Sequence, residues 1–163
     1  MYLSGNRFGA RAYADNFDEN ELLEAIKVAH LFSISVYLTV NTLIKEKEIN
    51  DVIDFLSPLV SAHLDGVIVQ DLGLVHVIHE SFPTLDIHAS TQMSITGSNF
   101  VRQLQKYNVK RIVPARELSL KEMIHIKSDT GIEIESFIHG AMCISYSGRC
   151  LLSNYFTGRD GNR

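Results

Sequence analysis

The chain has 163 residues, is 45% hydrophobic and carries a net charge of −4, so it can bury the core of one domain. The acidic balance disfavours a dedicated nucleic-acid-binding module. A stretch of about 18 apolar residues, as a transmembrane helix needs, is missing, and so are a signal peptide's basic start and apolar core. With two cysteines only, these features favour a cytoplasmic protein with no membrane partner.

Strands and helices are predicted to alternate along the whole chain. Short β-branched runs bounded by turn residues predict strands at 2–5, 33–41, 65–71, 85–90, 110–115 and 131–140. Amphipathic stretches between them predict five helices, at 18–32, 48–62, 72–81, 98–107 and 119–126. Asp18 with Glu21, and Ser119 with Glu122, have the spacing of capping boxes, and Pro58 is expected to bend or end its helix.

This alternation predicts an α/β fold with a parallel sheet, and a (β/α) barrel fits it better than a nucleotide-binding fold. Neither a Gly-x-Gly-x-x-Gly turn nor a phosphate-binding Gly-x-x-x-x-Gly-Lys-Ser/Thr loop is present. Six strands are two short of closure, so residues 1–163 are expected to form a single, incomplete barrel domain. Its unpaired edge strands predict that the fragment self-associates.

A functional site is expected where the strands end. In 33–41 and 131–140, aliphatic side chains alternate with polar ones, which places the polar groups towards the barrel axis. Barrel sites form at the C-terminal strand ends. The candidate substrate-binding residues there are Asn41, His88, Gln92 and Arg116. Arg7, Arg11 and Arg149 lie on predicted loops, and together with Arg116 they indicate an anionic ligand.

Glu135 and His139 are the candidate catalytic residues. A carboxylate within a buried strand is costly unless it is paired or protonated, so Glu135 has either a functional role or an ion pair with Arg116 or Arg149. His139 precedes Cys143 by four residues, which leaves open a catalytic Cys–His pair.

The segment GAMCISYSGRC contains Cys143 and Cys150, seven residues apart and separated mostly by small or hydroxylic residues. Two thiolates on one loop can supply half of the four ligands that an iron–sulfur cluster needs. Structural zinc pairs are usually two to four residues apart, which makes zinc a poor fit. A disulfide and two reduced cysteines that pack a buried loop remain as alternatives.

The segment ESFIHGAMCISYSGRCLLS resembles the signature of the collagenase-like peptidase family, the peptidases of unknown catalytic type numbered thirty-two. The matching residues are Glu135, Phe137, Gly140, Ala141, Met142, Cys143, Gly148, Cys150, Leu152 and Ser153. The segments FGARAYADNF, YLTVNTL, GVIVQDLG, HASTQMS and VPARELSL are also similar to this family. The resemblance extends over essentially the whole chain.

The resemblance implies a barrel that lacks its first strand–helix unit and its C-terminal region. Several members bind a [4Fe–4S] cluster through four cysteines, two of which match Cys143 and Cys150. Because the other two ligands lie outside the chain, the isolated fragment is expected to hold no cluster. The most similar branch is implicated in prephenate-dependent hydroxylation of the wobble uridine of transfer RNA, so transfer RNA and prephenate are the partners expected for the intact protein.

Two other functions remain open. The family label implies a peptidase, which would use Cys143 with His139, or a metal-held water with Glu135. The third hypothesis is a non-catalytic partner subunit that binds through the exposed edge of the barrel.

Overall fold

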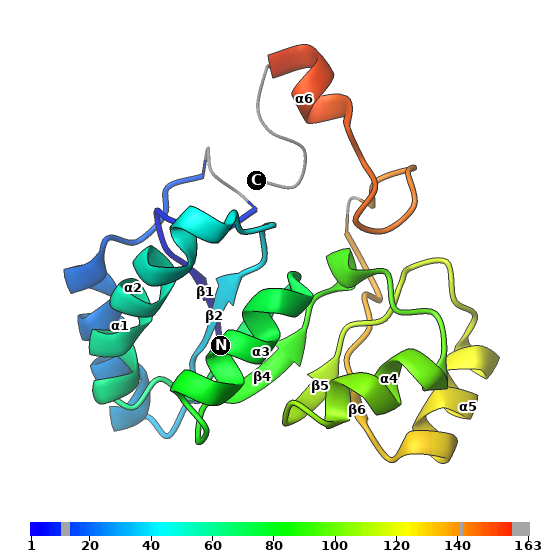
Figure 1. Cartoon of the computed structure of the whole chain (residues 1–163), viewed down its shortest axis with the longest axis horizontal. Coiled ribbons are helices and arrows are strands. Elements are labelled where there is room, and N and C mark those ends of the chain that lie inside the picture. Colours follow the sequence, from blue (N-terminus) through cyan, green and yellow to red (C-terminus); the bar gives the residue numbers. More distant parts are fainter. Residues whose placement is uncertain (11–13, 141, 158–163) are drawn as a thin grey trace.

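The computed structural model describes residues 1–10, 14–140 and 142–157, which form one curved, fully parallel sheet with helices outside it (Figure 1). The six strands follow one another in the order β1-β2-β3-β4-β5-β6. Their bounds are Tyr2–Ser4 (β1), Tyr37–Val40 (β2), Gly66–Val69 (β3), Asp86–Ala89 (β4), Val109–Ile112 (β5) and Glu133–Ile134 (β6). The predicted α/β barrel-like fold with six strands is thereby confirmed.

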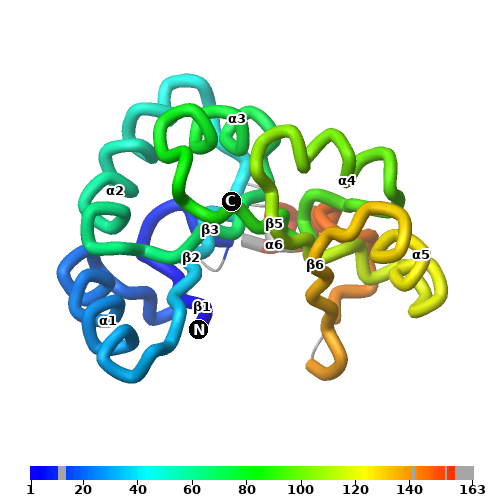
Figure 2. The backbone as a smooth tube through the Cα atoms, turned by 90° about the horizontal axis from the view of Figure 1, so that it is seen from below, coloured from blue at the N-terminus to red at the C-terminus, as the bar shows by residue number. Residues whose placement is uncertain are grey.

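Helices α1 to α5 connect the strands on one side of the sheet, and α6 follows β6. Their bounds are Glu19–Leu31 (α1), Ile49–Ser61 (α2), Leu72–Ser81 (α3), Ser98–Gln105 (α4), Leu120–Thr130 (α5) and Leu152–Thr157 (α6), with short 3₁₀ turns at Glu46–Glu48 and Thr91–Met93. Figure 2 shows α1 to α5 on an outer arc with the strands inside it, and β1 and β6 at the two ends of that arc. Among the described residues, no helix is long and apolar enough to span a membrane.

The hydrophobic core lies between the sheet and its helices. Along β2 and β3 every second residue is fully buried and faces the helices, as Leu38, Val40, Val67 and Val69 do. On β2, polar residues alternate with them and face the inside of the curve, where Thr39 and Asn41 line a pocket together with Ile68 of β3. The alternation predicted along 33–41 therefore gives β2 an apolar outer side and a polar inner side.

The helix starts follow the sequence closely. Asp18 and Glu21 form a reciprocal capping box at the start of α1, and Ser119 and Glu122 form one at the start of α5. Pro58 was expected to bend or end its helix, and it does not end it, because α2 continues to Ser61. The buried face of α2 outweighs the one backbone hydrogen bond that a proline near the last turn removes.

Two predicted strands are shorter than expected. Residues 33–36 are not a strand, because Ser33 adopts a left-handed conformation (φ 56°) as the chain leaves α1. The carboxylate of Asp65 bonds both His30 (2.9 Å) and the Val36 N–H (2.7 Å), which holds this turn against the start of β3. Residues 135–140 also leave the sheet, since β6 ends at Ile134.

Candidate functional site

A pocket of about 350 Å³ lies on the inner side of the sheet, towards the C-terminal ends of the strands. Its walls come from β1, β2, β3 and from the segments that follow β2, β4, β5 and β6. The lining residues are Tyr2, Leu3, Ser4, Ala10, Thr39, Asn41, Ile68, Ser90, Thr91, Val113, Glu135 and Phe137. We refer to it as the inner pocket. Apart from Glu135, its polar side chains are uncharged: they carry hydroxyls and, in Asn41, one amide.

Glu135 belongs to a network that joins the first strand to the last two. The Tyr2 hydroxyl donates to Glu135 Oε2, and Arg111 Nη1 donates to the Tyr2 hydroxyl (3.2 Å) and to Glu135 (3.4 Å). Arg111 also bonds Glu133 through Nε (3.0 Å) and Nη2 (2.9 Å). The ion-pair partner of Glu135 is thus Arg111, where the sequence had suggested Arg116 or Arg149.

These contacts set the protonation of the phenol. Burial, and then the hydrogen bond to Glu135, raise the pKa of Tyr2, so the phenol stays protonated and acts as the donor. For Glu133, the hydrogen bonds from Arg111 lower the pKa of the carboxyl. The network therefore places a neutral phenol and an arginine-paired carboxylate at one wall of the inner pocket.

His88, predicted to bind substrate at the rim of the barrel, is buried within the sheet. It is 2% exposed, stacks on Tyr37 with 4.6 Å between ring centroids, and pairs in register with Arg111. Burial, and then the charge of Arg111, lower the pKa of His88, so its imidazole is neutral at pH 7. Among the described residues, its Nδ1 and the Oε1 of Gln70 are buried without a hydrogen-bond partner.

The two cysteines line a second pocket of about 340 Å³, which we call the thiol pocket. Both are free; Cys143 is exposed and Cys150 half-buried. A backbone hydrogen bond from Ser145, and then the thiol of Cys150, lower the pKa of Cys143. Thr91 and Phe137 line both pockets, which makes the thiol pocket and the inner pocket neighbours.

The cysteine loop is held mainly by Arg116. Its guanidinium donates to the carbonyls of Cys143 (2.5 Å) and Ser145 (2.7 Å) and to Ser147 Oγ (3.1 Å). Glu117 accepts the Ser147 N–H (2.8 Å). Burial raises the pKa of the Glu117 carboxyl, but its hydrogen bonds, with that from the Ser147 N–H first, and the charge of Arg116 together lower it. Arg116 was predicted to bind substrate, and in the structure its N–H groups donate to the cysteine loop.

Close backbone packing completes the anchor. Ser147 is 2% exposed, and its carbonyl accepts from Ser94 Oγ (2.5 Å). Gly148 has φ +71°, and a Cβ built there would lie 2.0 Å from the Gln92 carbonyl oxygen. The loop therefore rests directly on the turn after β4, where a larger residue than glycine cannot fit.

The predicted arginines do not gather into an anion site among the described residues. Arg7 pairs with Asp51 (3.8 Å) and lies over the Phe8 ring, and Arg149 is exposed. Arg11 lies outside the described residues. His139 is exposed, and no hydrogen bond joins it to Cys143 in the described structure.

Asn41 and Gln92 lie where a ligand could reach them. Asn41 lines the inner pocket, and its Oδ1 accepts the Ala10 N–H (3.0 Å), which fixes the orientation of the amide. Gln92 lines the thiol pocket, and its buried Oε1 is without a partner among the described residues. Both remain predicted substrate-binding residues.

An iron–sulfur cluster fits the cysteine loop only in part. Cys143 and Cys150 are free, adjacent and open to a pocket, as two ligands of one cluster must be. A four-iron cluster needs four protein ligands, and the described residues contain no group of three or more candidate ligand side chains. The remaining ligands must therefore come from elsewhere.

Sequence reasoning missed Arg111 and Ser147. Arg111 follows Lys110 in a short strand, and a Lys-Arg pair resembles a solvated surface, although alternation from the buried Ile112 places Arg111 on the inner side. Ser147 is one of several serines in the loop, and the sequence does not indicate that it is buried.

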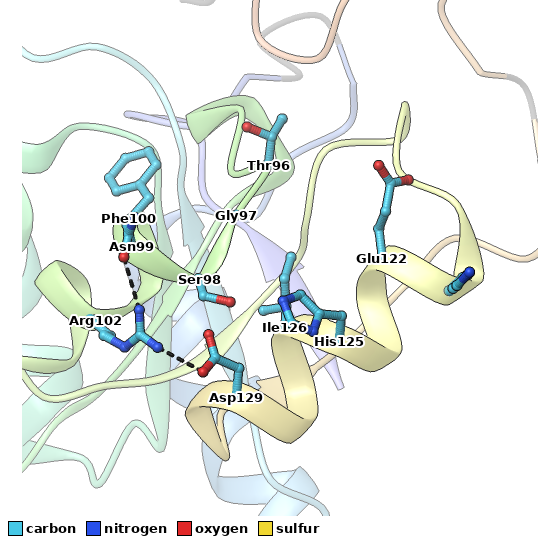
Figure 3. A pocket seen from close by; sticks show the side chains of 11 residues that line it. Thr96, Gly97, Ser98, Asn99, Phe100, Arg102, Glu122, His125, Ile126 and Asp129 are labelled. Carbon is cyan, nitrogen blue, oxygen red and sulfur yellow. Dashed lines mark hydrogen bonds and ion pairs between the residues drawn. The ribbon is translucent and has the colours of Figure 1, made fainter.

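A pocket of about 850 Å³, larger than the inner pocket and the thiol pocket, lies outside the sheet between α4 and α5 (Figure 3). Within it Arg102 donates to Asn99 (2.8 Å) and to Asp129 (2.7 Å), as the dashed lines in Figure 3 mark. These charged groups satisfy one another between two packed helices, and we assign the pocket no role.

Fold and site together define a (β/α) barrel-type protein with adjoining pockets at the C-terminal strand ends. Peptidase family U32 matches residues 1–163, so the chain belongs to this family. It is 38% identical to the tRNA hydroxylation protein P1 of Bacillus subtilis over 163 residues, which cover 100% of this chain and 39% of the relative.

Two further relatives bear on fold and function. The Escherichia coli 23S rRNA 5-hydroxycytidine synthase is 35% identical over 163 residues, 100% of this chain and 24% of that protein. The solved structure of a U32 peptidase superposes with a TM-score of 0.67 at 17% identity, covering 83% of this chain and 58% of the other. The chain spans only 39% of the Bacillus subtilis protein and 24% of the Escherichia coli synthase, and both are RNA hydroxylation proteins.

Proposed function

We propose that this chain forms the barrel part of an RNA-hydroxylating protein, with the wobble uridine of a transfer RNA as its substrate. The observation that carries the proposal is the sharing of Thr91 and Phe137 by two pockets, one whose wall is mostly apolar with several uncharged polar groups, the other lined by both thiols. This places a substrate-sized space beside a pair of potential metal ligands. The RNA hydroxylation relatives support the same class of reaction.

In this proposal Cys143 and Cys150 hold a [4Fe–4S] cluster together with two ligands from outside the described residues. The cluster would supply the one-electron chemistry that a hydroxylation needs and that side chains alone do not provide. Arg116 and Glu117 fix the loop that carries both thiols, and Tyr2 and Glu135, which bond each other, form part of the wall of the inner pocket.

Prephenate remains a predicted partner, placed at the rim of the barrel. Glu135 is the charged residue among those that line the inner pocket, and it would repel a dicarboxylate. Arg149 is the exposed rim arginine next to Cys150, so we propose that an anionic partner approaches from that side.

A peptidase is the second candidate, favoured by the lowered pKa of Cys143. It would require His139 to move within hydrogen-bond reach of Cys143. An isosteric change at Cys143 should abolish the modification of RNA if the first function is right, and the cleavage of peptides if the second is right.

The nucleosides of transfer RNA test the proposal. We expect transfer RNA from cells that lack the gene to lose a uridine nucleoside carrying one extra oxygen, measured by mass spectrometry after digestion. The full-length gene should restore it, and Cys143→Ala should not, whereas Ile144→Ala, a change at a 96% exposed neighbour, should restore it.

Two results would count against it. An unchanged nucleoside profile in the deletion strain would exclude RNA hydroxylation. Full restoration by Cys143→Ala would leave the chain with a non-catalytic role in the modification, as a partner subunit.

A further inference from the structure

We propose that the inner pocket binds the pyrimidine base itself, turned out of the RNA and stacked on Phe137, while the phosphates remain outside the barrel. This inference rests on the proposed function and names the part of the substrate that enters this site. Carbons of a base that is stacked within RNA are shielded, so enzymes that modify bases commonly take the base into a pocket.

The charge of the pocket selects a neutral ring. Among the described residues that line it, Glu135 is the charged one, and no lysine or arginine is present. Arg111, which bonds Tyr2 and Glu135 at this wall, is already paired with Glu133 and Glu135, so the described residues there offer a phosphate or a carboxylate no unpaired cation. The N–H groups of a base are donors suited to a carboxylate acceptor. The pocket therefore fits an uncharged ligand with N–H donors.

The polar groups match the edge of a pyrimidine. Asn41 follows β2, Ser90 and Thr91 follow β4, and all three line the pocket, with β3 between these two strands. Gln70 directly follows β3, between the strands that carry Asn41 and Ser90, and is 7% exposed with Oε1 unpartnered among the described residues. Gln70 is not one of the residues that line the pocket, so the uncharged polar groups available to a bound ring near these strand ends are those of Asn41, Ser90 and Thr91.

Phe137 is placed to stack on that ring. It lines the inner pocket and the thiol pocket, and it is 53% exposed, so its aromatic face is available at the junction between them. Stacking on aromatic side chains is the usual way in which proteins hold an unstacked base. A base held by Phe137 would lie directly beside the pocket of Cys143 and Cys150.

Binding of RNA by the purified full-length protein tests this without requiring hydroxylation. The probes are a short RNA hairpin with one uridine in its loop and the same hairpin abasic at that position, with affinity measured by fluorescence anisotropy. For Phe137→Ala we expect about tenfold or greater loss of affinity for the uridine hairpin and no change for the abasic one. Ile138→Ala, at a 96% exposed neighbour that lines neither pocket, should bind both as the wild type does.

Equal affinity of the wild type for both hairpins, or binding of neither, would overturn the inference. Displacement of the uridine hairpin by prephenate would also overturn the inference, because the pocket would then accept an anion. The two failures can be told apart. If the hairpins behave as expected while transfer RNA from the deletion strain is unchanged, the proposed reaction fails and the base pocket stands.

Discussion

Replacing Arg111 by methionine should lower the free energy of unfolding by about 2 kcal/mol at pH 7, measured by urea denaturation. The guanidinium is 26% exposed and bonds Tyr2, Glu133 and Glu135 from one position inside the sheet. Methionine keeps much of the volume but leaves two carboxylates near each other without their cation. We take a value below that of a fully buried pair, because Glu133 is 60% exposed.

The loss should depend on pH in a defined direction. The hydrogen bonds from Arg111 lower the pKa of Glu133 in the folded protein, so the stabilisation is present above the carboxyl's ordinary pKa. It is lost as the pH falls through the lowered folded-state value. The difference between wild type and Arg111→Met should therefore shrink below about pH 4.

Arg102→Met is the matched control. Arg102 bonds Asp129 at 2.7 Å, but on the outer surface, where its side chain is 47% exposed. Its replacement should cost about 0.5 kcal/mol or less. Equal losses for the two variants would show that the inner network adds nothing beyond a surface ion pair.

Replacing Gly148 by alanine should separate Cys143 from Cys150 while leaving most of the fold intact. The new Cβ would lie 2.0 Å from the Gln92 carbonyl oxygen, a contact that only a displacement of the loop can relieve. Displacement would break the bonds that Arg116 and Glu117 make to this loop. We expect disulfide formation between the two thiols under mild oxidant to slow by about tenfold or more, since bridging requires Cα atoms within about 7 Å.

Gly131→Ala distinguishes the clash from backbone strain. Gly131 has φ +72°, nearly the value of Gly148, but nothing lies within 4 Å of a Cβ built there. This control should lose some stability at the end of α5 and keep the wild-type rate of thiol oxidation. A normal oxidation rate in Gly148→Ala would contradict the loop anchor described above.

The sequence predicts the fold well because the information is local. Alternating apolar residues identify β2, a β-branched run identifies β3, and the Asp18 and Ser119 capping boxes mark where α1 and α5 begin. The errors arise where tertiary contacts decide. The bonds of Asp65 to His30 and Val36 hold 33–36 in a turn despite their β-branched composition.

The positions of the candidate site residues on the fold could be predicted better than their contacts. The rule that barrel sites form at C-terminal strand ends placed Asn41, Glu135 and the cysteine loop correctly relative to the sheet. The partners could not be predicted, because pairing depends on which side chains meet across the interior. Arg116 therefore looked like a ligand-binding cation, and it holds a loop, while Arg111 is the cation that pairs with Glu135.

Iron and acid-labile sulfide in the full-length protein, purified without oxygen, test the central claim most directly, beside the double variant Cys143→Ala and Cys150→Ala. We predict stoichiometric iron and sulfide in the wild type and their loss in the variant, with a circular dichroism spectrum that shows the fold is kept. An absence of iron from both proteins would contradict the assignment of the two thiols as cluster ligands, and so would equal iron in both.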